Sequence, residues 1–291
     1  MKTGLIMLFN LSVICCAAQD SALLKMLDDS ITNAPAKNFV TGTFKGTYII
    51  NTQSVEAPAK NVLLFLVMHR FGKINDGAYQ FFGLDNATMR LGFDYGITDR
   101  LSIGIGRSSF QKTFDGHLKY KLIRQTNTSP LTIAVFGGIY HTTLRYDDKD
   151  YLNATLRTSY DLELLLARKF TRNFSLQLTP SYLHYNLVPT VNDKNDVFAL
   201  GLGGRMLLTR RISVNAEYNY LPPGQVKSST VYSSLSAGID IETGGHVFQL
   251  HITNSHGMVE PLFLGKTDGS WGKGDIYFGF NISRNFNLNK H

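Results

Sequence analysis

The strongest constraint on the fold is a two-residue alternation of apolar and polar side chains that recurs along the chain. In residues 211–220, apolar or aromatic residues alternate with Arg211, Ser213, Asn215, Glu217 and Asn219. Successive side chains of a strand point to opposite faces, so such a strand has one face suited to lipid and one suited to water. The same division recurs at 87–97, 157–170 and 173–186. A soluble β-sandwich does not account for charges on the inner face of nearly every strand, and a soluble, lipocalin-like exported protein is the alternative fold.

Segments of this kind predict an all-β fold, a transmembrane antiparallel β-barrel of about 12 strands with a short N-terminal helix. We expect strands near 61–71, 87–97, 100–111, 115–125, 131–146, 156–170, 173–186, 196–209, 211–220, 231–243, 245–254 and 275–286. The count is even, as is typical of single-chain bacterial barrels.

The lengths of the connections give an independent indication of the same fold. Short links follow the second, sixth, eighth and tenth strands, and three of them are chemically alike: Thr98-Asp99-Arg100, Thr171-Arg172-Asn173 and Thr209-Arg210-Arg211. The link after the fourth strand is slightly longer, and the remaining links are longer and polar, the longest being Ser255–Lys273. Outer-membrane barrels have short periplasmic turns and longer external loops, so we expect both termini in the periplasm.

The first 18 residues have the parts of a secretory signal peptide. Lys2 supplies the positive start, Leu5 to Ala17 the apolar region, and Cys16-Ala17-Ala18 the small-residue cleavage site. The chain's two cysteines lie in this segment, so the mature protein has no thiol for a disulfide or a thiolate site. Beyond it, no run approaches the roughly 18 apolar residues that a spanning helix needs. We therefore expect export to the outer membrane, where the barrel contacts lipid.

We divide the mature chain into a periplasmic N-terminal segment or plug at 19–58 and the barrel at 59–291. Residues 21–32 have apolar side chains at helical spacing, which predicts a short helix. From Val40 onward the period changes to two, which would suit a strand. An additional strand would make the count odd, so we favour a plug or strap over 40–56 that could occlude the barrel.

Charged residues of both signs fall on the predicted inner face. We expect the lumen to be lined by Arg90, Asp94, Lys119, Lys121, Asp161, Glu163, Lys169, Arg205, Glu217 and Asp240. Balanced charge suits either an ion-paired interior or a weakly selective pore. The leading hypothesis is a narrow or gated channel for small solutes. The alternative is a non-enzymatic structural or docking barrel for another envelope protein.

Other chemistries have less support in the sequence. His246 and His251 are an odd number of residues apart on a strand and face opposite sides, so we expect no metal site, and we expect no cofactor. Lys and Arg are scattered among acidic residues, which argues against nucleic-acid binding. Outer-membrane lipid hydrolases use Ser, His and Asn, but here Asn254 precedes Ser255 and no second Asn is placed to orient His251. We therefore expect no enzymatic activity.

From about Val40 to the C-terminus, the chain resembles a Bacteroidetes-type family of outer-membrane β-barrels classified as a domain of unknown function. The matching segments include His69-Arg70-Phe71-Gly72, Phe82-Gly83-Leu84-Asp85, Tyr95-Gly96-Ile97-Thr98-Asp99 and Gly104-Ile105-Gly106-Arg107-Ser108-Ser109. The resemblance implies a barrel in the envelope but no activity. The terminal aromatic Phe286 is a partial match to the signal read by the barrel-insertion machinery.

The densest matches to this family make the first loop, Gly72 to Asp85, our choice for any specific contact. The opposing interpretation is that this loop folds inward and packs through Tyr79, Phe81 and Phe82.

Overall fold

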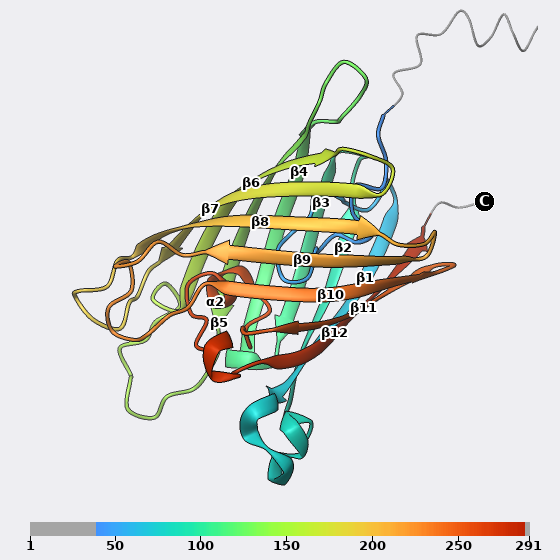
Figure 1. The fold of residues 1–291 in the computed structure, drawn as a ribbon. Coiled ribbons are helices and arrows are strands. Elements are labelled where there is room, and N and C mark those ends of the chain that lie inside the picture. The colour runs from blue at the N-terminus through green and yellow to red at the C-terminus, as the bar shows by residue number, and fades with distance from the viewer. Residues whose placement is uncertain (1–38, 289–291) are drawn as a thin grey trace, which may run out of the picture. The chain divides into compact units, whose positions relative to one another are not determined.

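The computed structural model describes residues 39–288, which form a closed barrel of twelve antiparallel strands (Figure 1). The strands are Val62–Lys73 (β1), Ala87–Gly96 (β2), Leu101–Ser108 (β3), Thr113–Ile123 (β4), Thr132–Thr142 (β5), Thr158–Lys169 (β6), Phe174–Tyr185 (β7), Asp196–Leu207 (β8), Ile212–Tyr220 (β9), Ser234–Thr243 (β10), His246–Thr253 (β11) and Tyr277–Asn287 (β12). Each strand pairs with its neighbours in sequence, and β1 closes the barrel by pairing with β12. The predicted fold class is therefore confirmed.

In the described part of the chain, the helices are short and lie in the connections between strands. They are the 3-10 helices Ile74–Asp76 (η1), Ala78–Gly83 (η2), Phe110–Lys112 (η3) and Trp271–Lys273 (η4), and the α-helix Glu260–Phe263 (α2). No helix among residues 39–288 is long and apolar enough to cross a membrane. The predicted signal peptide at 1–18 and the predicted helix at 21–32 lie outside the described residues.

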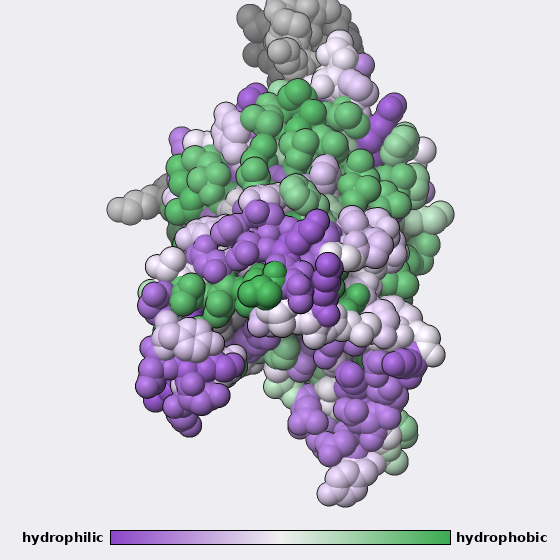
Figure 2. Space-filling view, turned by 90° about the vertical axis from the view of Figure 1, so that its left-hand side faces the viewer, coloured by the Kyte–Doolittle hydropathy of each residue, from purple (hydrophilic) through white to green (hydrophobic). Residues whose placement is uncertain are grey.

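The outer wall of the barrel carries the apolar half of each alternating strand. Ile105, Leu162 and Leu202, for example, are 67%, 54% and 52% exposed although they lie in the middle of strands. Figure 2 shows hydrophobic residues gathered in the upper part of one face and hydrophilic residues gathered below them. Exposed aliphatic and aromatic side chains on a closed barrel fit contact with lipid.

The repeated threonine of the short turns has a local physical cause. In the turn from β2 to β3, the Oγ1 of Thr98 accepts hydrogen bonds from the backbone N–H groups of Arg100 and Leu101, at 3.1 and 2.9 Å. Thr171 and Thr209 accept the equivalent pairs of bonds in the turns from β6 to β7 and from β8 to β9. A hydroxyl that accepts from the residues two and three positions onward stabilises a tight reversal of the chain.

Glycines on the inner face of β3 leave room for two pairs of polar side chains that reach from β2 to β4. Arg90 donates to both carboxylate oxygens of Asp115, and Nε2 of His117 lies 3.2 Å from Oδ1 of Asp94. A Cβ at Gly106 would lie 2.5 Å from Nη2 of Arg90, and one at Gly104 would collide with the His117 ring. The Gly-Ile-Gly segment of the sequence is thus required by the charged side chains that cross over it.

The first external loop protrudes from the end of β1 and does not pack inward. Its chain reverses where Gly83, at φ +86°, packs against the backbone of Gly72. The side chains of Tyr79, Phe81 and Phe82 are 91%, 60% and 54% exposed. The opposing interpretation, that these aromatic rings pack into the barrel, is therefore wrong, because the loop contributes almost no buried side chain.

We expect Gly106→Val to destabilise the barrel by about 3 kcal/mol, because its side chain would displace Arg90 and leave Asp115 as an unpaired buried charge. Ile105→Val, next to it on the lipid-facing side, should cost no more than about 1.5 kcal/mol. Urea unfolding of the barrel inserted in vesicles measures both. Equal stability of the two variants would contradict the role assigned to Gly106.

Candidate functional site

The candidate site is the lumen, which is occupied by the chain itself. Residues 43–56 precede β1 and lie inside the barrel, and we call this stretch the lumen segment. Most of its residues are buried, and it reverses direction at one isolated bridge, from Tyr48 to Gln53. We favoured a plug or strap over 40–56 rather than an additional strand, and the structure shows no strand between residue 39 and β1.

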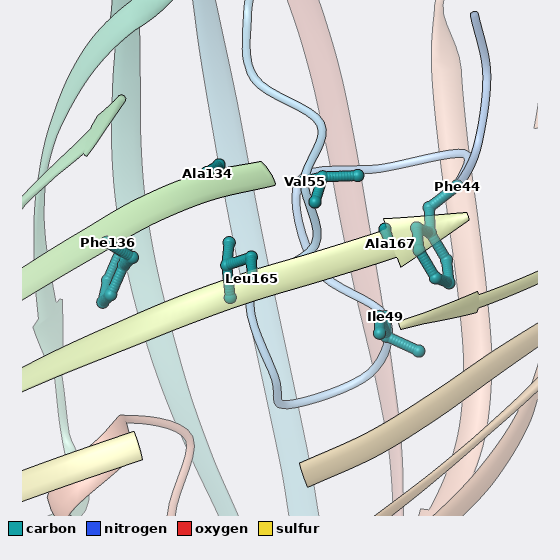
Figure 3. Close-up of a cluster of buried hydrophobic side chains, with 7 residues drawn as sticks. All are labelled: Phe44, Ile49, Val55, Ala134, Phe136, Leu165 and Ala167. Carbon is teal, nitrogen blue, oxygen red and sulfur yellow. The ribbon is translucent and has the colours of Figure 1, made fainter. Parts of the chain in front are cut away.

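Apolar contacts hold one side of the lumen segment. Its residues Phe44, Ile49 and Val55 pack against the inner faces of β5 and β6 (Figure 3). The wall residues of this cluster are Ala134, Phe136, Leu165 and Ala167. Gly203 on β8 provides further room, since a Cβ there would collide with Cδ1 of Ile49.

Polar contacts hold the backbone of the lumen segment, and the most concentrated of them is with Glu217 on β9. Its carboxylate accepts hydrogen bonds from the backbone N–H groups of Ile50, Asn51 and Thr52, at 3.1, 2.9 and 3.1 Å. Glu217 is 2% exposed. Three charge-assisted hydrogen bonds offset the loss of hydration of this carboxylate.

Positively charged side chains of the wall donate hydrogen bonds to the backbone carbonyl groups of residues 41–56. The ammonium group of Lys119 donates to the carbonyls of Thr47, Ser54 and Glu56, at 3.2, 2.8 and 3.0 Å. Arg205 donates to the carbonyls of Gly42 and Thr43, and Lys169 to that of Thr41. The positive side chains therefore serve as hydrogen-bond donors to backbone that has no sheet partner.

All ten residues predicted to line the lumen lie on the inner side of the strands, and they divide by what they contact. Lys119, Lys169, Arg205 and Glu217 bind the backbone at 41–56, and Lys121 lies 3.9 Å from Glu56. The remaining five bind wall or loop residues: Arg90, Asp94, Asp161, Glu163 and Asp240.

Several contacts to the lumen segment come from residues that the sequence did not single out. Arg70 donates to the side chain of Asn51 at 2.6 Å, and it is fully buried. Gln177 binds both Val55 and Gln53. The sequence could have pointed to Arg70 as a lumen residue only through its place in the His-Arg-Phe-Gly segment. The residues before it on the inner face of β1 are apolar, so this strand shows no alternation of apolar and polar residues.

The external end of the lumen is filled by the connection between β11 and β12. We expected Ser255–Lys273 to be a long polar external loop, but its first half folds into the barrel and buries Met258, Val259 and the whole of α2. Phe263 and Leu264 pack against an apolar patch on the inner faces of β7 and β8. Apolar residues within a polar loop are the sequence signal for this burial.

The inserted loop and the lumen segment meet in the middle of the barrel. Nε2 of Gln53 donates to Oε1 of Glu260 at 3.1 Å. The Tyr140 hydroxyl lies 2.7 Å from Oε2 of Glu260 and 3.0 Å from Oδ1 of Asp161, and it donates to one of them at a time because it has one hydrogen. Glu163 lies on the same strand as Asp161 and accepts from Ser181. Side chains from both insertions thus close the interior around these carboxylates.

The external loops beside this closure are tied to one another through Asp193. Its carboxylate accepts hydrogen bonds from the backbone N–H groups of Lys227 and Ser228, at 2.6 and 2.9 Å, and from Thr190. These donors, the Lys227 N–H first among them, lower the pKa of Asp193. The connection between β7 and β8 is thereby fixed to that between β9 and β10.

The residues considered for lipid hydrolysis do not form a catalytic arrangement. Ser255 is buried within the barrel, and its hydroxyl donates to the carbonyl of Gly257 at 3.4 Å. His251 faces the lumen, and neither of its ring nitrogens has a hydrogen-bond partner in the described part of the chain. An oriented base and an accessible nucleophile are both required for nucleophilic catalysis.

Comparison with solved structures finds barrels of low sequence identity. The NanC porin is 8% identical, with a TM-score of 0.48, over 76% of this chain and 97% of that one. The COG4313 outer membrane channel from Pseudomonas putida F1 is 14% identical, with a TM-score of 0.46, over 79% and 97%. The outer membrane protein Omp33 of Acinetobacter baumannii is 10% identical, with a TM-score of 0.43, over 78% and 99%.

No curated protein matches the chain. The model of one family does match it, over residues 44–286, which span the lumen segment and all the strands almost to the end of β12. That family is described as a membrane-bound β-barrel domain. The chain therefore belongs to the membrane-bound β-barrel family DUF5777 and is an outer-membrane β-barrel.

Proposed function

We propose that this barrel is a narrow, gated channel for small solutes, closed by the lumen segment and by the inserted loop that contacts it through Glu260, and opened when the lumen segment moves aside and the inserted loop moves with it. The observation that supports the proposal is how residues 43–56 are held. They are bound by side-chain hydrogen bonds and an apolar patch, and they do not join the ladder of the barrel wall. An element that is held in this way can leave without breaking the barrel.

The energetics fit a reversible plug. A hydrogen bond to a charged group contributes about 1.5–3 kcal/mol, but water entering an opened lumen would replace many of these bonds. The net cost of opening is therefore a small difference between large terms. Twelve strands lie between the roughly 8 that leave a filled interior and the 16 to 18 that leave a wide pore. Displacement of the segment would open a narrow path lined by charges of both signs, which suits weak ion selectivity.

We expect Glu217→Ala to raise the open probability in planar bilayers by about 10- to 100-fold, because the variant loses the acceptor of three backbone N–H groups at the tip of the segment. This change corresponds to a loss of about 1.4–2.8 kcal/mol from the free energy that favours the closed state. Asp85→Ala, which removes an exposed carboxylate of the first loop, is the matched control and should behave as the parent protein. Deletion of residues 40–56 should give the open state permanently. A barrel that stays silent after this deletion would rule out the channel.

We also propose that the barrel is non-enzymatic. The burial of Ser255 and the unpartnered ring of His251 support this, since neither arrangement activates a nucleophile toward lipid. Lipid hydrolysis by the purified barrel that is lost in Ser255→Ala would contradict it.

A second candidate function, a docking barrel for another envelope protein, is favoured by the first loop. Large exposed aromatic side chains are typical of interaction sites, and here three of them gather on one protruding connection. Phe81 and Phe82 also adopt positive φ, at 45° and 54°, which is uncommon for non-glycine residues and indicates a constrained loop.

For the docking function, we expect crosslinking in intact cells to recover the same partner repeatedly with the parent protein and to lose it in Tyr79→Ser/Phe81→Ser. The double substitution replaces exposed side chains only, so barrel stability should be unchanged. Recovery of that partner by both proteins would show that the loop is not the docking surface.

A further inference from the structure

A cavity of about 360 Å³ lies at the external end of the barrel, above the inserted loop. Its floor includes Val259, which precedes α2, and Pro261 and Leu262, which belong to α2. Its sides come from the connections between β5 and β6 and between β7 and β8. The floor is fixed, because the Tyr185 hydroxyl donates to the carbonyl of Pro261 at 2.6 Å. Ligand sites usually occupy about 300–1,000 Å³, so this volume suits a small ligand.

Aromatic rings make up much of the cavity wall. Tyr146 and Tyr151 reach it from the connection after β5, and Tyr185 reaches it from the end of β7. No hydrogen bond within residues 39–288 involves the hydroxyl of Tyr146 or Tyr151, so both remain open to a ligand. Tyrosine combines a flat apolar surface with a polar tip, which suits a ring that carries polar groups.

Three cationic side chains also line the cavity. The ammonium group of Lys149 lies 4.4 Å from the Tyr146 ring centre, and that of Lys266 lies 5.0 Å from the Tyr185 ring centre. Neither lysine has a carboxylate partner in the described part of the chain. Arg157 donates to the carbonyls of Leu144 and Leu152, which holds the connection between β5 and β6 in shape.

No carboxylate lines this cavity. Asp147, Asp148 and Asp150 belong to the same connection as Lys149 but are not among the lining residues. Asp161 and Glu260 both contact the hydroxyl of Tyr140, whose side chain lines the cavity in their place. The cavity therefore presents unpaired positive charge without a competing negative group.

We propose that this external cavity binds a small carboxylate built on a single ring, such as a sugar acid or an aromatic acid. The lysines would meet the carboxylate from two different loops while the tyrosine rings stack on the ring of the ligand. This inference deepens the proposed channel by naming the class of solute, and in that respect it rests on the proposed function.

The expected affinity is modest. Ion pairs that remain accessible to water contribute roughly 0.2–1 kcal/mol each, so each lysine should account for about a 1.4- to 5-fold change in affinity. Weak binding also suits passage, because a solute that binds tightly at the entrance would not leave it. The affinity should fall as salt concentration rises, since the site faces water.

The test is isothermal titration calorimetry on the full folded barrel in detergent, with two matched pairs of probes. D-glucuronate is compared with D-glucose, and benzoate with benzyl alcohol, so each pair differs in charge on one kind of ring. Binding by the first acid indicates a sugar acid and by the second an aromatic acid. Lys149→Gln/Lys266→Gln should lower the affinity for whichever acid binds by about 2- to 25-fold, which is the product of the two single effects. Lys227→Gln, an external lysine outside the cavity, should leave it unchanged.

Two outcomes would overturn the inference: that neither acid binds more tightly than its neutral partner, or that the double lysine variant binds the acid as well as the parent protein does. Failure of the channel is a separate result, since calorimetry does not depend on conductance. Acid binding by a barrel that never conducts would support the binding site and contradict the channel. Conductance without acid binding would support the channel and contradict the binding site.

Discussion

The structure depends on one constraint, which is that a buried backbone must form hydrogen bonds. The lumen segment lies in the barrel without joining its sheet, so most of its N–H and carbonyl groups have no backbone partner. The exceptions are the hydrogen bonds from Ile49 to Thr52 and from Ser54 to Thr47. Side chains of the wall supply the missing partners, with the Glu217 carboxylate accepting from N–H groups and the Lys119 ammonium donating to carbonyls. Charges of both signs are needed for this reason. The balanced interior is thus a consequence of the inserted segment and not only of ion pairing within the wall.

The wall also provides apolar surface where the insertions lie against it. The inner faces of β5 and β6 receive Phe44 and Ile49, and those of β7 and β8 receive Phe263 of the external loop. Two insertions from opposite ends then meet through the hydrogen bond from Gln53 to Glu260. Tyr48 and Met258 also share a buried apolar cluster. Movement of either insertion would break these contacts, which connect the inserted loop below the external cavity to the lumen segment.

The sequence was sufficient for the wall, but of the two insertions that fill the lumen it suggested only the plug over 40–56. All twelve strands could be placed because lipid on one side and charge on the other impose the alternation directly. Arg70 escaped notice because the inner face of β1 also carries Leu66 and Met68, which hide the period. The burial of Glu260 could not be foreseen, since a loop has no periodicity to show which way it folds. The first loop was open to two interpretations, and the exposure of Tyr79 and its neighbours removes the one in which the loop packs inward.

The central claim is that the lumen segment is a reversible gate, and a disulfide across its contact with the wall tests this most directly. Ile49→Cys/Gly203→Cys suits the purpose, because a Cβ at residue 203 would lie 3.6 Å from Cγ1 and Cγ2 of Ile49 and the mature chain is expected to have no other cysteine. Single-channel conductance is recorded before and after reduction. The account predicts a silent barrel when the disulfide is formed and openings once it is reduced. The same conductance in both states, whether open or silent, would contradict it.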